Sequence, residues 1–303
     1  MSPADPRLRA IAGDLIGLRH AARRLSLAPH RVRSPLSGSR LSPFRGRGLE
    51  FDESRRYQPG DDTLAMDWRV TARTGQPHVK LFRQERERPV LLWIDMRRAM
   101  MFASRGALKA VQAARAAAQL AWAARARGDR VGALLFHDRG HLLLRPRGGD
   151  RGVTGLIQAL CDFPDWEGPI GFDITPPPLE QELMRLRRVA RPGTLVFLIS
   201  DFRGLEDNAA AHFARLTDHC DVVALFVQDP LEEHPPPPGR YPFSDGRRRL
   251  EWRGGAAQEY SRSFCQRRDR AAALCRAWRV PLFPLDTPVT VEEQLARHLG
   301  DTR

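Results

Sequence analysis

Two aspartates that end apolar runs are the residues of this chain best suited to chemistry. Asp95 follows the uncharged run 89–94, and Asp201 ends a second apolar run that begins at Leu195. Uncharged runs of this length are typical of strands that are covered on both faces of a parallel sheet. Because ligand crevices of such sheets lie at the carboxyl ends of the strands, we expect both carboxylates to face one crevice.

Paired carboxylates could serve a hydrolase, but the sequence shows little other catalytic machinery. A phosphatase with an aspartate nucleophile would need a second aspartate two residues after Asp95, and Arg97 stands there. The chain has no G-x-x-x-x-G-K-[ST] loop, no G-x-G-x-x-G after a strand and no G-x-S-x-G elbow. Ser104 and Ser200 have no evident histidine partner in the sequence. We therefore expect no enzymatic activity, and a hydrolase that uses Asp95 and Asp201 stays the alternative.

Strands and helices alternate from residue 89 to residue 299, which predicts an α/β domain with one doubly wound, mostly parallel sheet over 89–303. The predicted strands are 89–95, 131–136, 142–145 as an antiparallel edge strand, 195–201, 222–227 and 280–285. The predicted helices are 107–127, 150–161 with Asp150 as its cap, 179–189, 205–216, 260–278 and one that opens with a capping box at Thr290 and Glu293. Residues 235–238 are predicted to form an extended proline spacer.

The first 44 residues are predicted to form an amphipathic helix and a linker. Apolar residues recur at three- and four-residue steps between Leu8 and Leu25, with arginines between them. We expect this helix to dock on the body of the protein, and a partner-binding or membrane-surface helix is the alternative. Residues 28–48 are rich in proline, serine, glycine and arginine, as connectors often are.

Residues 45–88 carry balanced charge and are predicted to form a β-hairpin annex. Eight acidic and eight basic residues lie between Gly48 and Arg88. The turn sequence 74–77 separates two extended-looking runs at 68–71 and 79–82. The aromatic residues Phe51, Tyr57 and Trp68 are expected to anchor the annex to the main core. The charges could form a structural lattice of ion pairs or a recognition surface, and both readings stay open.

Composition limits the class of partner. The 303-residue chain has a net charge of +13, but its basic residues are almost all arginine, and Lys80 and Lys109 are the two lysines. Arginine, alanine and proline excess is typical of a GC-rich bacterial genome, so we expect no nucleic-acid partner. No window resembles a membrane span or a signal peptide, which predicts a cytoplasmic protein. His137 and His141 flank a turn and have no third ligand nearby, so they do not predict a metal site.

The segment before residue 89 resembles a family signature. Its run GRGLEFDESRRYQPGDDTLAMDWRVTARTGQPHVKLFRQERE resembles the signature of the bacterial family called domain of unknown function 58, and the likeness extends over nearly all of the chain after Arg45. Leu64 and Ala65 depart from the signature, because that family tends to carry arginine there. The matching positions are Gly48, Glu50, Phe51, Arg55, Tyr57, Gly60, Asp61, Asp67, Trp68, Ala72, Arg73 and Lys80.

This resemblance implies a domain of von Willebrand factor A type with a metal-ion-dependent adhesion site. Such a site combines Asp-x-Ser-x-Ser after the first strand, a threonine in a later loop and an aspartate after the fourth strand, and it suits Mg²⁺. Asp95, Thr175 and Asp201 stand at the matching positions, but Arg97 and Ala99 replace both serines.

The two substitutions favour a degenerate site without metal. A fixed guanidinium beside the site repels a dication, and it can bind carboxylates with two nitrogens. We therefore expect Arg97 or Arg98 to pair with Asp95 and Asp201, no cofactor to be present, and Mg²⁺ to be the alternative ligand in an adhesion-type binder. The other reading is that Arg97 points to solvent and both carboxylates are hydrated.

The resemblance also implies a partner class. Relatives are typically linked with MoxR-type AAA+ ATPases in the maturation or assembly of other protein complexes. We thus expect a non-enzymatic adaptor that binds such an ATPase and a client protein through its crevice and the annex. The annex residues expected to contribute are Glu50, Arg55, Tyr57, Asp61, Asp67, Trp68, Arg73 and Lys80.

Overall fold

The computed structural model describes residues 5–27, 49–58, 66–84, 87–166, 176–206, 208–234, 239–244, 249–253 and 257–300. Contacts between Cα atoms divide the chain into two compact units. The first unit holds residues 1–30 and 88–303, and the second holds residues 31–87. Each unit is described by itself.

The first unit is built on a six-stranded sheet with the order β10-β7-β6-β3-β4-β5. Its strands are β3 (Pro89–Asp95), β4 (Arg130–His137), β5 (Gly140–Arg147), β6 (Leu195–Ser200), β7 (Asp221–Gln228) and β10 (Leu282–Asp286). All neighbours run parallel except β4 and β5, which form an antiparallel hairpin. The predicted α/β class, mostly parallel sheet and antiparallel edge strand are confirmed.

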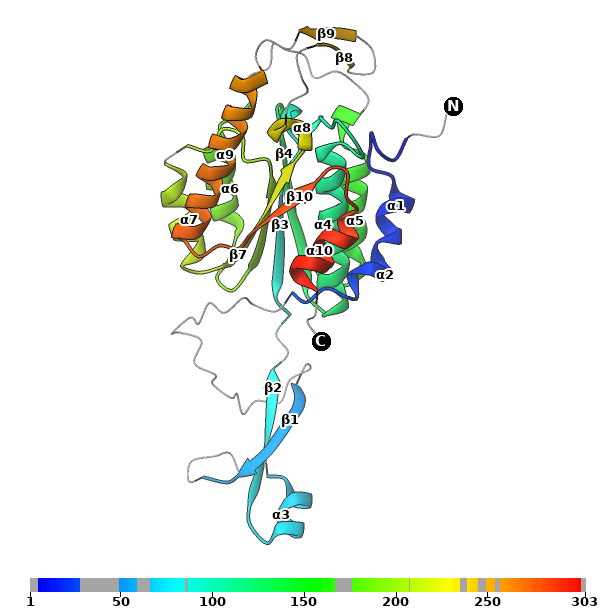
Figure 1. The fold of residues 1–303 in the computed structure, drawn as a ribbon. Helices are drawn as coiled ribbons and strands as arrows, with labels where there is room; N and C mark the ends of the chain where they lie inside the picture. The colour runs from blue at the N-terminus through cyan, green and yellow to red at the C-terminus, as the bar shows by residue number, and fades with distance from the viewer. Residues whose placement is uncertain are drawn as a thin grey trace. The chain divides into compact units, whose positions relative to one another are not determined.

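Helices cover both faces of this sheet (Figure 1). One face carries α1 (Ala12–Gly17), α2 (Arg19–Ala22), α4 (Lys109–Ala126), α5 (Asp150–Cys161) and α10 (Val291–Leu299), and the other carries α6 (Leu179–Val189), α7 (Ala209–Thr217) and α9 (Ala257–Ala277). The remaining elements are η2 (Arg98–Met100), η3 (Pro164–Trp166), α8 (Pro230–Glu233) and the antiparallel pair β8 (Arg240–Ser244) and β9 (Arg249–Arg253). Among the described residues no helix combines the length and the apolar character that crossing a bilayer requires.

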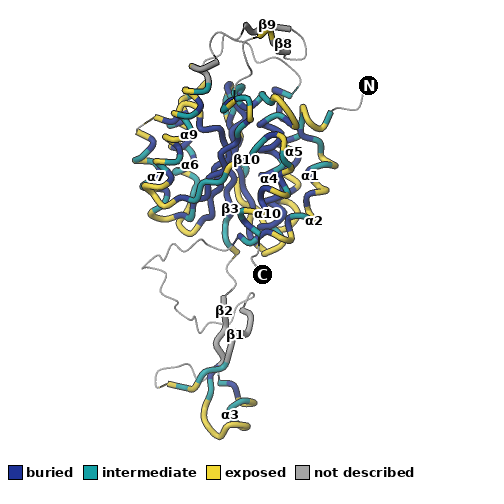
Figure 2. Tube along the Cα trace, viewed as in Figure 1, coloured by how far each residue is buried: buried dark blue, intermediate teal, exposed yellow. Residues whose placement is uncertain are grey.

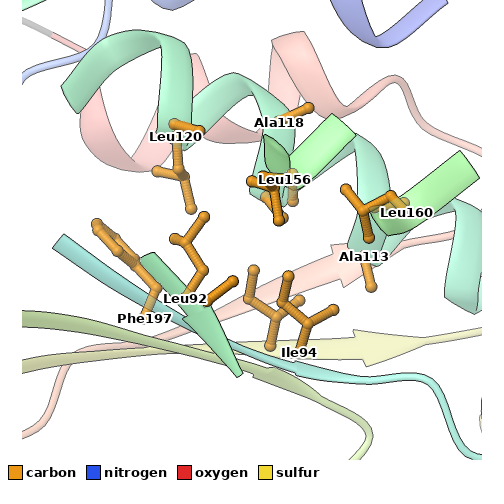
Figure 3. Close-up of a cluster of buried hydrophobic side chains, with 14 of the residues drawn as sticks. Leu92, Ile94, Ala113, Ala118, Leu120, Leu156, Leu160 and Phe197 are labelled. Carbon is orange, nitrogen blue, oxygen red and sulfur yellow. The ribbon is translucent and has the colours of Figure 1, made fainter. Parts of the chain in front are cut away.

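The core forms because the central strands are apolar on both faces. All of β3 except Pro89 is buried, and the whole of β6 is buried (Figure 2). Leu92 and Ile94 meet Ala113 and Ala118 of α4 and Leu156 of α5 (Figure 3). Small alanine side chains let α4 approach the sheet closely, which explains why nearly all of its residues are buried.

The N-terminal residues dock on this body, as the first of the two readings predicted. Instead of one helix they form two short ones, which meet at Gly17 and Leu18. Leu15, Leu18 and Leu25 of this segment are buried in the core cluster that includes α4, whereas Leu8 and Ile16 are exposed. The backbone oxygen of Leu15 accepts a hydrogen bond from Trp122 Nε1 at 3.1 Å. Both helices belong to the first unit.

The second unit contains β1 (Leu49–Arg56) and β2 (His78–Gln84), which pair antiparallel, with α3 (Trp68–Thr74) between them. The predicted strand at 68–71 is wrong. Asp67 caps a helix there, because its carboxylate accepts from Val70 N at 3.2 Å, and Gly75 ends it with a φ of +70°. Trp68, in the first turn of this helix, is 70% exposed.

Two predicted helix caps differ from the structure as well. Gly149 stands at the N-cap of α5 with a φ of +65°, and Asp150 lies in the first turn, where it pairs with Arg125 at 2.7 Å. At α10, Thr290 makes no side-chain cap, because its hydroxyl lies 3.3 Å from the Glu293 carboxylate instead. The capping box is therefore not formed.

Candidate functional site

Acidic residues gather where the parallel strands end. Asp95 is the last residue of β3, and Asp201 directly follows β6, the neighbouring strand. The chain leaves β3 toward β4 on one side, whereas β6 lies on the other side, so strand order reverses between β3 and β6. This is the position at which open α/β sheets bind their ligands. Both carboxylates are completely buried, at 0% exposure.

Arg97 satisfies most of the hydrogen-bonding capacity of Asp95. Its Nε donates to Asp95 Oδ1 at 3.0 Å, and its Nη2 donates to Oδ2 at 2.7 Å. The backbone amide of Arg97 donates to Oδ1 as well, at 3.0 Å. Ser200 Oγ adds a fourth donor to Oδ2 at 2.6 Å. The Asp95 carboxylate is thus saturated by a bidentate ion pair and two further donors.

The guanidinium of Arg97 is itself enclosed. The residue is 5% exposed, its Nη2 also donates to the backbone oxygen of Arg203 at 2.9 Å, and its Cζ lies 5.5 Å from the ring centroid of Phe136. Burial disfavours the charge, but the neighbouring Asp95 outweighs it and holds the pKa of Arg97 above its ordinary value. The reading in which this side chain points to solvent is therefore wrong.

Asp201 is paired with Lys109 rather than with Arg97. Lys109 Nζ lies 2.9 Å from Asp201 Oδ2 and 3.1 Å from Glu232 Oε1, and its side chain is completely buried. Burial alone would raise the pKa of Asp201, but Lys109, Arg267 and Arg203 outweigh it and hold this pKa well below its usual value. Lys109 was missed as a site residue, although its position as one of two lysines in an arginine-rich chain was a visible signal.

Glu232 connects this pair to the opposite helical layer. Its Oε1 accepts from Arg267 Nη2 of α9 at 2.9 Å, and its Oε2 accepts from the backbone amide of Asp229 at 3.1 Å. Arg203, whose side chain is 49% exposed, lies 3.7 Å from both Asp201 and Glu232. The acids of β6 and α8 are therefore matched by cations from α4, α9 and the loop after β6.

The loop after β6 is held in an unusual conformation. Phe202 has a φ of +53°, which is rare for a residue with a side chain. Its backbone amide donates to Ser200 Oγ at 2.8 Å, and its buried ring stacks on Phe226 at 6.0 Å between centroids. Ser200 donates to Asp95 and Asp201 accepts from Lys109, because consecutive residues at the end of a strand point to opposite sides.

A third aspartate at this edge was not predicted as a site residue. Asp229, directly after β7, accepts from the backbone amide and hydroxyl of Ser104 at 2.8 and 2.6 Å and from the Thr287 hydroxyl at 2.5 Å. It also caps α8 through Leu231 N at 2.9 Å. These neutral donors join three loops, which indicates a structural role for Asp229.

The donor set does not suit a divalent cation. The oxygens of Asp95 and Asp201 already accept from Arg97, Ser200, Lys109 and the Arg203 amide, and two buried cations stand beside them. Within the described residues, no group of three histidine, cysteine or acidic side chains is placed to hold a metal. Thr175 lies outside the described residues.

Each of the remaining predicted site residues is described within its own unit. The backbone amide of Arg98 donates to Asp138 Oδ2 at 2.6 Å. In the second unit, Asp67 accepts from Ser54 Oγ at 2.7 Å, Arg55 donates to the Arg56 backbone oxygen at 3.1 Å, and the amide of Tyr57 donates to Pro77. Arg73 is exposed in the last turn of α3. The side chains of Glu50 and Lys80, and all of Asp61, lie outside the described residues.

Comparisons with known proteins match this chain to proteins without an assigned function. Uncharacterized proteins of Mycobacterium bovis and of two strains of Mycobacterium tuberculosis are each 31% identical to it over 244 residues, which are 80% of this chain and 73% of theirs. A crystal structure of the conserved hypothetical protein BatB from Bacteroides thetaiotaomicron aligns with a TM-score of 0.45 and 15% identity, over 69% of this chain and 96% of BatB. A family model described as "Protein of unknown function DUF58" matches residues 53–272, so this chain belongs to the DUF58 family.

Proposed function

We propose that this chain is a non-enzymatic adaptor that binds other proteins at the carboxyl edge of its sheet without a metal ion. On this proposal the edge is a von Willebrand factor A-type adhesion site in which arginine and lysine replace the cation. The observation that carries the proposal is the buried, bidentate pair of Arg97 with Asp95. A guanidinium cannot lose its proton at physiological pH, so the site would keep one charge state.

The state of both acids supports an adaptor over a hydrolase. A general base or nucleophile needs an accessible oxygen near the reacting atom. Asp95 and Asp201 are fully buried and bonded to cations, and the amide and hydroxyl of neighbouring residues take up their remaining capacity. No observation favours the hydrolase, and the adaptor needs no reactive group.

Arg203 would present the charge of this edge to a partner. Its side chain is half exposed above the buried pair of Lys109 and Asp201, whereas Arg97 and Lys109 lie below the surface. The proposed partner is a MoxR-type AAA+ ATPase, and the proposed role is the maturation or assembly of another protein complex. The proposed location is the cytoplasm.

A reconstituted binding assay tests this proposal. The tagged full-length chain is mixed with the MoxR-type ATPase of the same organism under ATPγS, ADP and nucleotide-free conditions, and retained ATPase is quantified. We expect retention in at least one nucleotide state. Arg203→Glu reverses a charge at the carboxyl edge, and we expect it to weaken retention about tenfold or more, since charge reversal in an interface commonly costs more than 1.4 kcal/mol.

Arg215→Glu is the matched control. Arg215 is exposed in the last turn of α7, which runs away from the carboxyl edge, so we expect this variant to bind like the wild type. Absence of the ATPase in every nucleotide state would contradict the proposed partner. Equal loss in both charge-reversal variants would show that the carboxyl edge is not the contact surface.

A further inference from the structure

Among the described strands, β5 is the last one at its end of the sheet, and its outer edge has no strand beside it. It lies at one end of the strand order, and it pairs on its inner side with β4 from His137–Gly140 to Val131–Arg147. In an antiparallel pair, alternate residues of an edge strand direct their N–H and C=O groups away from the neighbouring strand. Within the described part of the chain, residues 140–145 make no backbone hydrogen bond beyond their pairing with β4. The outer edge is thus open for a further strand.

Two leucines make this edge unusually apolar. Leu142 is 46% exposed and Leu143 is 37% exposed, and as consecutive strand residues they point to opposite faces of the sheet. Soluble proteins commonly protect such edges with proline, charge or a bulge. Here Pro146 and the register shift between Val131 and Ala133 affect only the C-terminal part of the strand. The segment from Gly140 to Leu144 keeps a regular register with β4.

The charges around this edge favour an acidic partner. Arg139, Arg145 and Arg147 are exposed, and among the described residues their side chains make no ion pair. A second copy of β5 in antiparallel pairing centred on Leu143 would place Arg145 opposite His141 and Arg147 opposite Arg139. Like charges directly opposite each other destabilise a strand pair, so self-pairing is disfavoured. An extended segment with alternating apolar and acidic residues would complement both leucines and arginines.

We propose that β5 binds an extended acidic segment of a partner protein, which adds to the sheet as a seventh strand. Main-chain hydrogen bonds along 140–144 would supply affinity, and contacts with the leucines and arginines would supply selectivity. This surface is separate from the cluster around Asp95, so the inference goes beyond the adaptor site and does not depend on the metal-free proposal.

Peptide selection on the full-length chain tests the inference. A phage library of random nonamers is selected against immobilised protein, and the enriched consensus is synthesised with a fluorescein label for anisotropy measurements. We expect consensus sequences in which Asp or Glu alternates with apolar residues. N-methylation of alternate residues along the peptide edge that faces β5 should weaken binding about tenfold or more, because several hydrogen bonds are lost, whereas N-methylation along the opposite edge should not.

Variants locate the binding site. Arg145→Glu with Arg147→Glu should weaken binding of the acidic peptide at least about tenfold, whereas Arg188→Glu with Arg215→Glu, at exposed positions on α6 and α7, should not. Leu143→Pro should abolish binding if it folds, and the charge variants keep the test valid if it does not. Failure to enrich any peptide, enrichment of basic peptides, or equal effects of both N-methylation patterns would overturn the inference. If the protein dimerises in a concentration-dependent way and the β5 variants do not, the occupant of this edge is a second copy of the chain. That result would overturn the inference as well.

Discussion

Arg97 supplies three of the donors around Asp95, two from its guanidinium and one from its own backbone amide. The two residues are separated by one position, so a local turn forms the pair without any contribution from a distant segment. The same carboxylate then receives Ser200 from the neighbouring strand, which joins β3 and β6 at their ends. Removing one partner of such a buried pair destabilises the fold strongly, because the other charge stays buried without a counter-ion.

Replacing Arg97 with methionine is therefore expected to lower the free energy of unfolding by about 3–5 kcal/mol. The reason is that Asp95 stays buried at 0% exposure while it loses its counter-ion. Urea denaturation followed by circular dichroism measures the change. The double variant Arg97→Met with Asp95→Asn should cost clearly less than the sum of the two single variants, because both charges are then removed. Additive costs would show that the pair contributes no coupling.

The sequence predicted the sheet well because its signal was local. Each central strand is an uninterrupted apolar run, and such runs identify buried strands without knowledge of their neighbours. The positions of Asp95 and Asp201 follow directly from the ends of those runs. The pairing of Asp201 with Lys109 did not follow, because the two residues are distant in sequence and meet only through the crossover from β3 to α4. Helix α3 was mistaken for a strand because its β-branched residues concealed the cap at Asp67.

Acid should destabilise the protein partly through Asp201. Its pKa is held below the ordinary value of 3.8 in the folded state, mainly by Lys109 against the effect of burial. The stabilisation is therefore complete above the unfolded-state pKa and is lost as the pH falls below about 4 toward the folded-state pKa. Urea denaturation between pH 6 and pH 2.5 should show a shallower decline for Asp201→Asn than for the wild type. Glu259→Gln, at an exposed position, is the control and should follow the wild type.

The four cysteines should separate into two reactivity classes. Burial raises the pKa of Cys220 to about 11 and of Cys275 to about 12. Burial raises the pKa of Cys161 as well, but Cys161 and Cys265 are only partly buried, so a reagent can reach them. Since the thiolate is the reactive form, Ellman's reagent at pH 8 should label Cys161 and Cys265 in the native protein and all four cysteines in urea. Cys161→Ser with Cys265→Ser should remove the native signal, and Cys220→Ser with Cys275→Ser should leave it. Rapid labelling of Cys220 and Cys275 in the native protein would contradict their burial.

Two glycines separate the cost of a left-handed backbone conformation from the cost of a steric clash. Gly106 and Gly128 both have positive φ, at +72° and +80°, but an added Cβ would lie 2.2 Å from the Thr287 backbone oxygen at Gly106 and in open space at Gly128. Alanine at position 128 should cost about 1–2 kcal/mol from its backbone conformation alone. Alanine at position 106 should cost more, because the loop that carries Thr287 must move. Equal costs in thermal or urea denaturation would contradict this close approach.

The proposal that Arg97 takes the place of a metal ion can be tested by restoring the hydroxyl ligands. Wild-type protein should show no saturable heat of Mn²⁺ binding in calorimetry, since Arg97 and Lys109 already neutralise Asp95 and Asp201. Arg97→Ser with Ala99→Ser recreates Asp-x-Ser-x-Ser and removes one buried cation, so it should bind Mn²⁺ at one site. Adding Lys109→Gln removes the second cation and should tighten that binding further, because Coulomb repulsion between like charges falls with each step. Asp95→Asn in the same background should abolish it, which serves as the control for non-specific binding. Saturable Mn²⁺ binding by the wild type that is lost in Asp95→Ala would mean that the arginine does not replace the metal.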